Sequence, residues 1–417
     1  MGCTTTAQQC SRCMLTFHIT CDPNVPCLPL SVISPEPLID DSTYNASDDY
    51  YSYPALGYVH QNYIPTSLND FDMLALLGMG ASAKVYVASR KTSGDLVALK
   101  CISTTSVLND FSNLRSVTFM EKRVLMSSVN SPFIIKLYST FRTVSHLIYA
   151  VEFVSGNSVM HHLFLAPNGY FDIDRARFYA AEIACAIEYL HSLRIIHRDI
   201  KTDNVLLTHD GHVKVADFGL SFMGEQQATT ICGTPSYMAP EIVMNQGYDK
   251  TVDWWSLGCF IYEMLTGEVP FALDTRFQLG RNNLSELVRN YEKNFPNLER
   301  IEDESARSIL KKLLVIDPAL RLQNLEQLKR EPFFHSDDWN WDDLEAGRAN
   351  PPELLQHHSY GRIITNPVTN EEIDLSYFDN YYNDAKLSSI RSDLANVIAS
   401  RSDFLRNFSF SIFSADK

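Results

Sequence analysis

The spacing of hydrophobic and polar positions changes sharply near Phe71. Residues 1–70 mix cysteine, proline, serine, tyrosine and aspartate with neither the helical nor the strand period, which predicts a largely disordered segment. Three short strand-like runs then follow, at residues 72–78, 83–89 and 95–102. We expect these runs to be strands, the last two joined by a turn at residues 90–95.

Helical spacing begins past Asn113, where Val117, Met120, Glu121, Val124 and Leu125 recur at helical intervals. Residues 174–193 form a long helical run with small and apolar side chains on one face. Residues 251–267 form another, apolar nearly all round, which predicts a buried helix. After Phe334 the chain becomes polar and aromatic and lacks the spacing of a second core. We find no internal repeats.

Composition narrows the classes of protein that fit. The chain has 417 residues, 45% of them hydrophobic, which suits one large globular domain or a few smaller ones. Its net charge of −15 argues against a nucleic-acid binder, which needs a basic surface. No apolar run approaches the roughly 18 residues of a membrane-spanning helix. Cys101, Cys185, Cys232 and Cys259 are scattered through apolar sequence and are expected to be reduced core thiols of a cytosolic protein.

The first residues carry a different signal. Five cysteines and His18 crowd residues 1–27, but their spacing fits no common zinc module. "MGCTTT" fits the N-myristoylation pattern, with Gly2 as the acceptor. One acyl chain binds membranes only marginally, and residues 1–70 hold a single arginine and no lysine. Palmitoylation of Cys3 is therefore the expected second anchor, and an unmodified tail remains the open alternative.

The stretch "LLGMGASAKVYVAS" from Leu76 resembles a phosphate-binding glycine loop in which Ala83 replaces the third glycine. It lies between two strands, which excludes the Rossmann and Walker A loops because both lead into a helix. A glycine loop inside a hairpin instead folds over phosphates as a flap. In the following strand, Ala98 and Lys100 share a face. Glu121, on the next helix, could pair with Lys100, and a solvated edge lysine is the alternative that these residues alone leave open.

The segment "IIHRDIKTDNVLLTHDGHVKVADFGLS" concentrates catalytic residue types. Its Asp-Gly pair predicts a two-residue hairpin turn, which sets Thr208 opposite Val213, Leu206 opposite Val215 and Asn204 opposite Asp217. An amide and a carboxylate side by side would suit Mg²⁺ with bound phosphates. Asp199 can orient a hydroxyl nucleophile and take its proton, and Lys201 can hold the transferring phosphoryl group.

With these motifs, the chain resembles a protein kinase from Phe71 to Phe334. The matching motifs are "VALK" at Lys100, Glu121, "HRDIKTDN", "DFG" at 217–219 and "APE" at 239–241. The resemblance implies an α+β, bilobal kinase fold, with a small antiparallel sheet lobe carrying one helix at 71–152 and a mainly helical lobe at 153–334. It implies ATP and Mg²⁺ as cofactors, with catalytic residues Lys100, Asp199, Lys201, Asn204 and Asp217, of which Asn204 and Asp217 bind the metal. It places the nucleotide against Leu77, Gly78, Met79, Gly80, Ala81, Ser82, Ala83, Lys84, Val85, Ala98, Lys100, Glu121, Glu152 and Leu206.

"TTICGTPSYMAPE" is similar to the activation segment of AGC-type serine/threonine kinases, which puts Thr230 at the regulatory phosphosite and Thr234 against the catalytic aspartate. The same resemblance pairs Glu241 with Arg321 and lets Asp253 brace the catalytic loop. It also stacks a hydrophobic spine of Leu125, Leu137, His197 and Phe218. Residues 335–417 resemble the AGC C-terminal tail: "YFDNYYND" would cross the active site, and residues 405–410 would dock on the small lobe with Ser409 as a phosphosite. Within the AGC group, we place the chain nearest the ribosomal S6 kinase-related branch.

Three departures from the family pattern matter. Ala83 is small, so the flap should still close. Val117 and Phe222 stand where many relatives have basic residues, which leaves Arg198 to bind a phosphate on Thr230 and predicts a weaker dependence on that phosphate. Ser158 replaces a glutamate that reads a substrate arginine, although Asp203 and Glu263 still offer negative charge. Ile231 and Met238 suggest an apolar pocket for the residue after the target.

The sequence therefore predicts a serine/threonine kinase that uses Mg-ATP on protein substrates. Its expected partners are an upstream activating kinase and a membrane surface on the cytoplasmic face, reached through acylation. The alternative is a membrane-tethered pseudokinase scaffold. Pseudokinases usually lack one of the positions occupied here by Lys100, Asp199 and Asp217.

Overall fold

The computed structural model of the chain describes residues 66–79, 83–104, 114–143, 145–271, 291, 295–355, 363–375, 378 and 410–411. Predictions made for Gly2, Cys3, Ser409 and the loop residues 80–82 lie outside the described residues and stay predictions. Within the described part, no helix is both long enough and apolar enough to cross a membrane.

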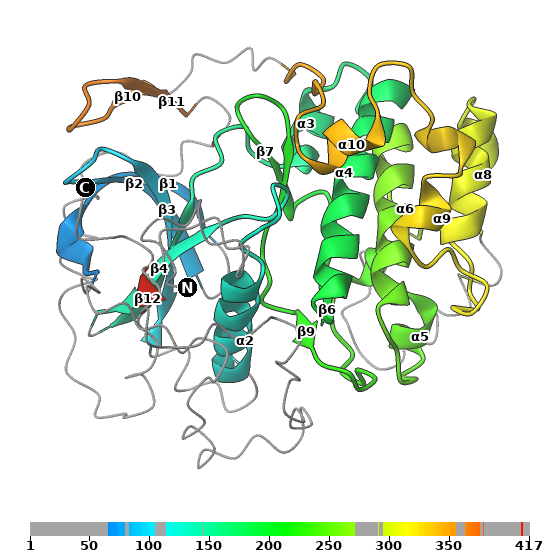
Figure 1. Ribbon diagram of the computed structural model, residues 1–417, viewed down its shortest axis with the longest axis horizontal. Coiled ribbons are helices and arrows are strands. Elements are labelled where there is room, and N and C mark those ends of the chain that lie inside the picture. Colours follow the sequence, from blue (N-terminus) through cyan, green and yellow to red (C-terminus); the bar gives the residue numbers. More distant parts are fainter. Residues whose placement is uncertain are drawn as a thin grey trace, which may run out of the picture. The chain divides into compact units, whose positions relative to one another are not determined.

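An antiparallel sheet forms the first part of the fold (Figure 1). In sheet order, its strands are β1 Phe71–Met79, β2 Ala83–Arg90, β3 Leu96–Ser103, β5 His146–Glu152, β4 Leu137–Arg142 and β12 Phe410–Ser411. A 3-10 turn at Leu68–Asp70 leads into β1. The three strands expected from the alternating runs are confirmed as β1, β2 and β3. Helix α2, Leu114–Ser127, follows β3, as the helical spacing predicted.

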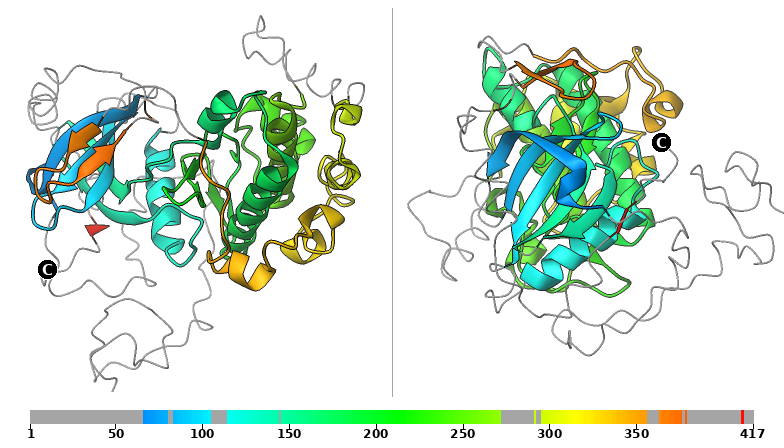
Figure 2. Two further views of the ribbon diagram at one scale, coloured as in Figure 1. Left: turned by 90° about the horizontal axis from the view of Figure 1, so that it is seen from above. Right: turned by 90° about the vertical axis from the view of Figure 1, so that its left-hand side faces the viewer.

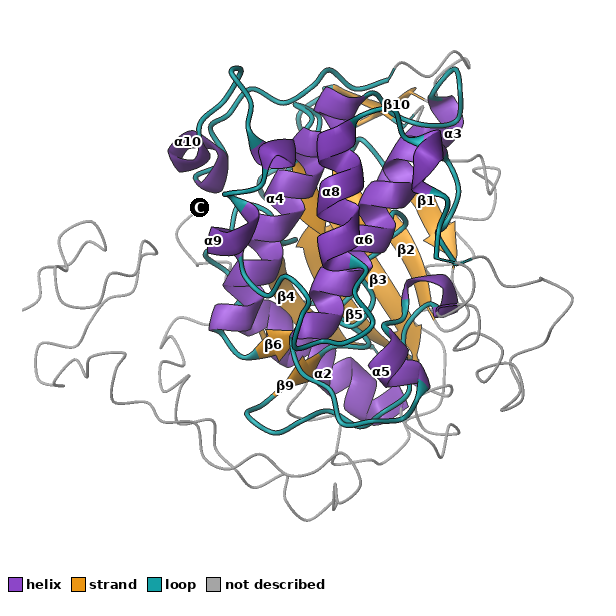
Figure 3. Cartoon of the chain, turned by 90° about the vertical axis from the view of Figure 1, so that its right-hand side faces the viewer, coloured by secondary structure: helices purple, strands orange, loops and turns teal. Residues whose placement is uncertain are grey.

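Helices dominate the second part, where α4 and α6 pack against each other and α8 packs on α6 (Figure 3). The helices are α3 Val159–Leu165, α4 Ile173–Ser192, α5 Pro240–Val243, α6 Thr251–Thr266, α8 Glu304–Leu313, α9 Leu325–Leu328 and α10 Trp341–Glu345. Three 3-10 turns lie at Pro235–Tyr237, Leu298–Arg300 and Pro332–Phe334. Helix α6 is buried along almost its whole length, as its apolar sequence predicted. The α+β, two-part architecture is therefore confirmed.

The ends of the two long helices are fixed by their sequences. Asp172 caps α4 by accepting a hydrogen bond from the amide of Arg175 at 2.8 Å. Gly267 ends α6 with a φ of 73°, in the left-handed region that glycine enters without strain. A Cβ at Gly267 would also lie 2.5 Å from the carbonyl oxygen of Gly169. The free thiols of Cys101, Cys185 and Cys259 are buried and that of Cys232 is half-buried, in line with reduced core cysteines.

Two short strand pairs lie beside the catalytic sequence, and one corrects the predicted register. They are β6 Ile195–Ile196 with β9 Phe222–Met223, and β7 Val205–Leu207 with β8 Val213–Val215. In the β7–β8 hairpin, Val205 pairs with Val215 and Leu206 with Lys214, one residue away from the expected partners. The loop holds three residues rather than two, because the amide of Thr208 donates to the carbonyl of His212.

The shifted register places Asn204 opposite Ala216, whose amide donates to the carbonyl of Asn204 at 2.9 Å. Asn204 is therefore not the direct cross-strand partner of Asp217, and that prediction was wrong. Gly211 supplies the physical reason, since its φ of 96° lets a third residue enter the turn.

Residues 363–374 form another hairpin, which we call the tail hairpin, from β10 Ile363–Thr365 and β11 Glu372–Asp374 (Figure 2). Asn366, with 2% exposure, fixes its turn to the sheet. Its side-chain oxygen accepts from the hydroxyl of Ser89 at 2.9 Å, and its nitrogen donates to the carbonyl of Gly94 at 2.7 Å. Ile373 and Leu375 then pack on Ala75 of β1 and Val87 of β2.

Strand β12 lies at the β4 edge of the sheet. Phe410 pairs with Thr140 and Ser411 with Ser139, both antiparallel. This backbone pairing agrees with the expectation that residues 405–410 dock on the sheet lobe. Only residues 410 and 411 of this segment are described, and Ser409 lies outside the described residues.

Candidate active site

Three charged side chains from separate parts of the chain lie close together next to strand β3 of the sheet. Lys100 of β3 lies 2.6 Å from the carboxylate of Glu121 on α2 and 3.1 Å from that of Asp217. Burial lowers the pKa of Lys100, but the two carboxylates outweigh burial and raise it above its ordinary value. Lys100 in turn holds the pKa of Asp217 below its ordinary value. Lys100 is therefore a fixed cation and Asp217 a fixed anion near neutral pH.

A second cluster surrounds Asp199. One oxygen of this carboxylate accepts hydrogen bonds from the amide and the hydroxyl of Thr234, at 2.9 and 2.7 Å. The other oxygen accepts from the side-chain nitrogen of Asn204 at 2.8 Å and lies 3.2 Å from the ammonium of Lys201. Lys201 also donates to the hydroxyl of Thr234 at 2.8 Å. Asp199 is thus oriented at both oxygens, the condition for a positioned general base.

Asp253 of α6 holds the backbone just before Asp199 in place through hydrogen bonds. Its carboxylate accepts the amides of His197 and Arg198, each at 2.9 Å, and lies 2.8 Å from the ring nitrogen Nε2 of His191. Burial raises the pKa of Asp253, but these hydrogen bonds outweigh burial and leave it below its ordinary value. The brace matters because Arg198 holds a φ of 68°, which non-glycine residues rarely adopt.

The four spine residues expected from the resemblance are all buried, and two of them are in ring contact. The rings of His197 and Phe218 meet edge to face, with centroids 4.9 Å apart. Leu125 of α2 and Leu137 of β4 belong to the same core as Phe218. Asp217, just before Phe218, has a φ of 59° and turns its side chain outward.

The activation segment departs from the sequence prediction at Arg198. Its guanidinium donates to the carbonyls of Leu220 and Ser221, at 2.5 and 3.1 Å, and lies over the ring of Phe222. It also donates to the hydroxyl of Tyr248 at 3.0 Å, so it is not simply held available for a phosphate as the sequence reading supposed. Tyr248, which sequence reasoning missed, donates its own hydroxyl to the carbonyl of Thr230 at 2.6 Å.

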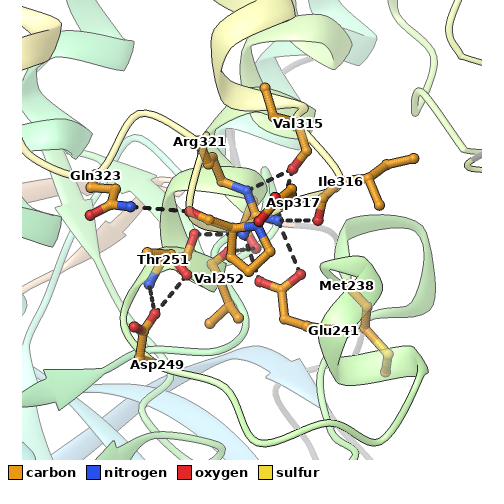
Figure 4. A network of polar contacts seen from close by, with 12 residues as sticks. Met238, Glu241, Asp249, Thr251, Val252, Val315, Ile316, Asp317, Arg321 and Gln323 are labelled. Atoms are coloured by element: carbon orange, nitrogen blue, oxygen red, sulfur yellow. Dashed lines mark hydrogen bonds and ion pairs between the residues drawn. The ribbon is translucent and has the colours of Figure 1, made fainter.

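Glu241 and Arg321 form the expected buried ion pair, shown in Figure 4. The guanidinium binds the two carboxylate oxygens at 2.6 and 3.0 Å. It also donates to the carbonyls of Thr251 and Val315. This network joins α5, at the end of the activation segment, to the start of α6 and to the loop after α8.

Comparison with known proteins decides the family. The model of the family described as "Protein kinase domain" matches residues 71–334. The chain belongs to the protein kinase family. Its relatives place this kinase among the AGC-type serine/threonine kinases, and they include protein kinase C delta type of Homo sapiens, 38% identical over 319 residues. That alignment covers 75% of this kinase and 45% of the relative.

Two further relatives give the same picture. Protein kinase C eta type of Homo sapiens is 34% identical over 370 residues, covering 82% of this kinase and 52% of the relative. Serine/threonine protein kinase ypkA of Aspergillus fumigatus is 38% identical over 277 residues, covering 65% and 42%. This kinase therefore spans about half the length of the curated relatives it matches.

Most of the nucleotide residues predicted for the kinase lie on the first three strands of the sheet. Leu77 and Met79 end β1, Ala83, Lys84 and Val85 begin β2, and Ala98 lies two residues before Lys100 on β3. A Cβ at Gly78 would meet nothing within 4 Å, so the flap has open space at this glycine. Leu206 of β7 is half-buried beside Ser158, its bridge partner. The carboxylate of Glu152 binds the ammonium of Lys214 at 3.0 Å and the amide of Lys136 at 3.2 Å, and its role toward the nucleotide stays a prediction.

The oxygen donors of the kinase fit Mg²⁺ but do not form a complete cage. Asp217 has a side chain 54% exposed, with a charged carboxylate that can face a ligand. Asn204 adds an amide oxygen. No group of three or more metal-binding side chains of the usual types gathers anywhere in the described part of the chain. Mg²⁺ characteristically takes one or two protein oxygens and completes its shell with water and phosphates, so two donors suffice.

Proposed function

We propose that this chain transfers the γ-phosphoryl group of Mg-ATP to serine or threonine hydroxyls of protein substrates. The proposal rests on the presence of two clusters whose charged side chains are already held in place by contacts with one another. They are Lys100–Glu121–Asp217 on the nucleotide side and Asp199–Lys201–Thr234 on the acceptor side. Family membership and the two oriented carboxylates support phosphoryl transfer over simple nucleotide binding.

In this proposal, each side chain has one role. Lys100 holds phosphate oxygens, and Glu121 keeps its ammonium in place. Asn204 and Asp217 would hold Mg²⁺, which neutralises charge on the phosphate oxygens when bound. Asp199 accepts the proton of the substrate hydroxyl, while Lys201, 3.2 Å away, stabilises the negative charge of the transferring group.

Regulation is the second part of the proposal. Thr230 is the activation-segment phosphosite, served by an upstream kinase, and Ser409 is the tail phosphosite. The contact from Tyr248 to the carbonyl of Thr230 supports a weak dependence on phosphorylation, because it tethers the segment without a phosphate. Acylation of Gly2 and Cys3 would hold the kinase at the cytoplasmic face of a membrane. Within the AGC group, placement near the ribosomal S6 kinase-related branch stays a prediction.

The deciding experiment measures phosphate transfer from Mg-ATP to an array of serine and threonine peptides. Purified wild type is compared with Asp217→Asn and with Asp337→Asn, the same change at an exposed surface position. We expect transfer by wild type and Asp337→Asn and none by Asp217→Asn. Equal transfer by all three would reject the role of Asp217. Silence from all three, with ATP still bound, would favour the pseudokinase scaffold.

A further inference from the structure

A hollow of about 450 Å³ lies beside the catalytic loop, between α3, the α3–α4 loop and the end of α6. Its walls are mostly apolar and include Met160, Leu163 and Phe164 of α3. Gly169 and Gly267 also line it and contribute no side chain that could fill it. Phe164 has 79% exposure, more than any other large hydrophobic residue in the part of the chain that the structure describes. Phe164 therefore presents a large apolar side chain to solvent at one wall of the hollow.

Hydrogen bonds tie the hollow to the catalytic loop. The amide of Met160 donates to the carbonyl of Thr202 at 3.0 Å. The hydroxyl of Thr202 donates to the carboxylate of Glu263, which also lines the hollow, at 2.8 Å. Thr202 directly follows Lys201, so the hollow begins close to the acceptor cluster. Its position is therefore fixed relative to Asp199.

The charges around the hollow favour an apolar occupant over a cation. Ser158, at the position where a reader of basic residues was expected, caps α3 by accepting the amide of His161 at 3.2 Å. Glu263 has only 4% exposure, and one oxygen of its carboxylate, Oε2, accepts hydrogen bonds from the hydroxyls of both Thr202 and Tyr237. Burial also raises the pKa of Glu263 above its ordinary value. Asp203 is exposed and does not line the hollow.

The direction in which the chain of a substrate peptide would run can be inferred from the apolar residues of the activation segment and from the hollow beside α3. Ile231 and Met238 of the activation segment are the residues predicted to contact the residue after the acceptor, and Ile231 is exposed whereas Met238 is buried. Thr202 is buried, and its hydrogen bonds connect the catalytic loop to Met160 of α3 and to Glu263, both of which line the hollow. A peptide held at both places would send its N-terminal side toward α3.

We propose that this hollow is a substrate subsite for an aliphatic side chain on the N-terminal side of the target serine or threonine. The occupant is a leucine-like residue of an extended substrate segment, packed against Phe164. This assignment rests on the proposed kinase function and names part of its substrate class. Burial of one such side chain corresponds to roughly a tenfold preference or more in kcat/KM.

The test starts from a peptide that wild type phosphorylates. Leucine replaces alanine at each position from the second to the seventh before the acceptor, one peptide at a time. The proteins are wild type, Phe164→Asp, Phe164→Leu and, as the matched control, Leu320→Asp, because Leu320 has 74% exposure and does not line the hollow. The readout is the ratio of kcat/KM for the leucine peptide to that for the alanine peptide.

We expect a ratio of about ten at one upstream position in wild type, in Phe164→Leu and in Leu320→Asp, and a ratio near one in Phe164→Asp. A wild type that phosphorylates the peptides without preferring leucine anywhere would overturn the subsite and leave the kinase function standing. A leucine preference that survives in Phe164→Asp would overturn it as well. No transfer to any peptide would overturn the proposed function, and the subsite with it.

Discussion

Replacing Arg321 with methionine should cost this kinase a large share of its stability. The side chain of Arg321 has no exposed surface and that of Glu241 is 4% exposed, so water cannot solvate the carboxylate once its partner is gone. The change would also leave the carbonyls of Thr251 and Val315 without their donor. Removing one partner of a buried pair costs about 3–5 kcal/mol.

That loss is a large fraction of the stability of about 5–15 kcal/mol that a folded domain has. For a domain of this size, each kcal/mol corresponds to roughly 2–4 °C in melting temperature, so we expect a drop of roughly 10 °C. Thermal unfolding followed by circular dichroism measures it. Lys91→Ala is the matched control, because Lys91 and Asp72 form a pair 3.7 Å apart with side chains 40% and 33% exposed. Surface pairs contribute about 0–1 kcal/mol.

The double variant Glu241→Gln, Arg321→Met separates charge burial from lost packing. It removes both charges, so it should unfold at a higher temperature than Arg321→Met alone. A drop of less than about 3 °C in Arg321→Met would show that the carboxylate is relieved by water or by rearrangement, and the reasoning would then fail. A double variant as unstable as the single one would assign the loss to packing over Trp255, whose ring lies 5.1 Å from the guanidinium carbon.

Three further outcomes are expected. Lys100 lowers the pKa of Asp217 in the folded protein, so Lys100→Met should remove the stability that this ion pair contributes. That contribution is present above pH about 4 and is lost as the pH falls further. The melting temperatures of wild type and variant should therefore differ at neutral pH and converge in acid. Thr230→Ala should reduce peptide phosphorylation without abolishing it, and complete loss would contradict a tether through Tyr248. Gly2→Ala should move the protein from the membrane fraction to the supernatant after cell fractionation; an unchanged distribution would reject acylation at Gly2.

The spacing of apolar residues predicted the strands and helices well, because an element that is buried on one face carries apolar residues at the period of that element. The alternation around Lys100 and the helical spacing around Glu121 placed each side chain on its correct face before any contact was known. The contact between them was one alternative that these faces allowed, and the family resemblance favoured it over a solvated lysine. The pairing of Glu241 with Arg321 came from the family resemblance alone, since nothing local to either residue marks its partner.

The errors came from choices that local sequence leaves open. An Asp-Gly pair fits a hairpin loop of either two or three residues. In the structure the hydrogen bond from the amide of Thr208 to the carbonyl of His212 closes a three-residue loop. The longer loop shifts the register by one residue, so Asn204 does not lie opposite its expected partner. Tyr248 was missed because its role depends on the pairing of its backbone with Ala228 of the activation segment. Asn366 was missed for a similar reason: a polar residue in a polar tail gives no sign that it will be buried.

The tail hairpin determines how far a recombinant form of this protein must extend beyond the kinase domain. Ala75 and Val87 are fully buried, and their outer cover comes from Ile373 and Leu375. A chain ended at Phe334, where the family match stops, would leave an apolar stripe of the sheet in water and invite self-association during expression. Recombinant forms should therefore extend at least through Phe378, whose ring lies 6.0 Å from that of Phe153. Poor yield from a shorter chain would then reflect an uncovered sheet rather than a defective catalytic centre.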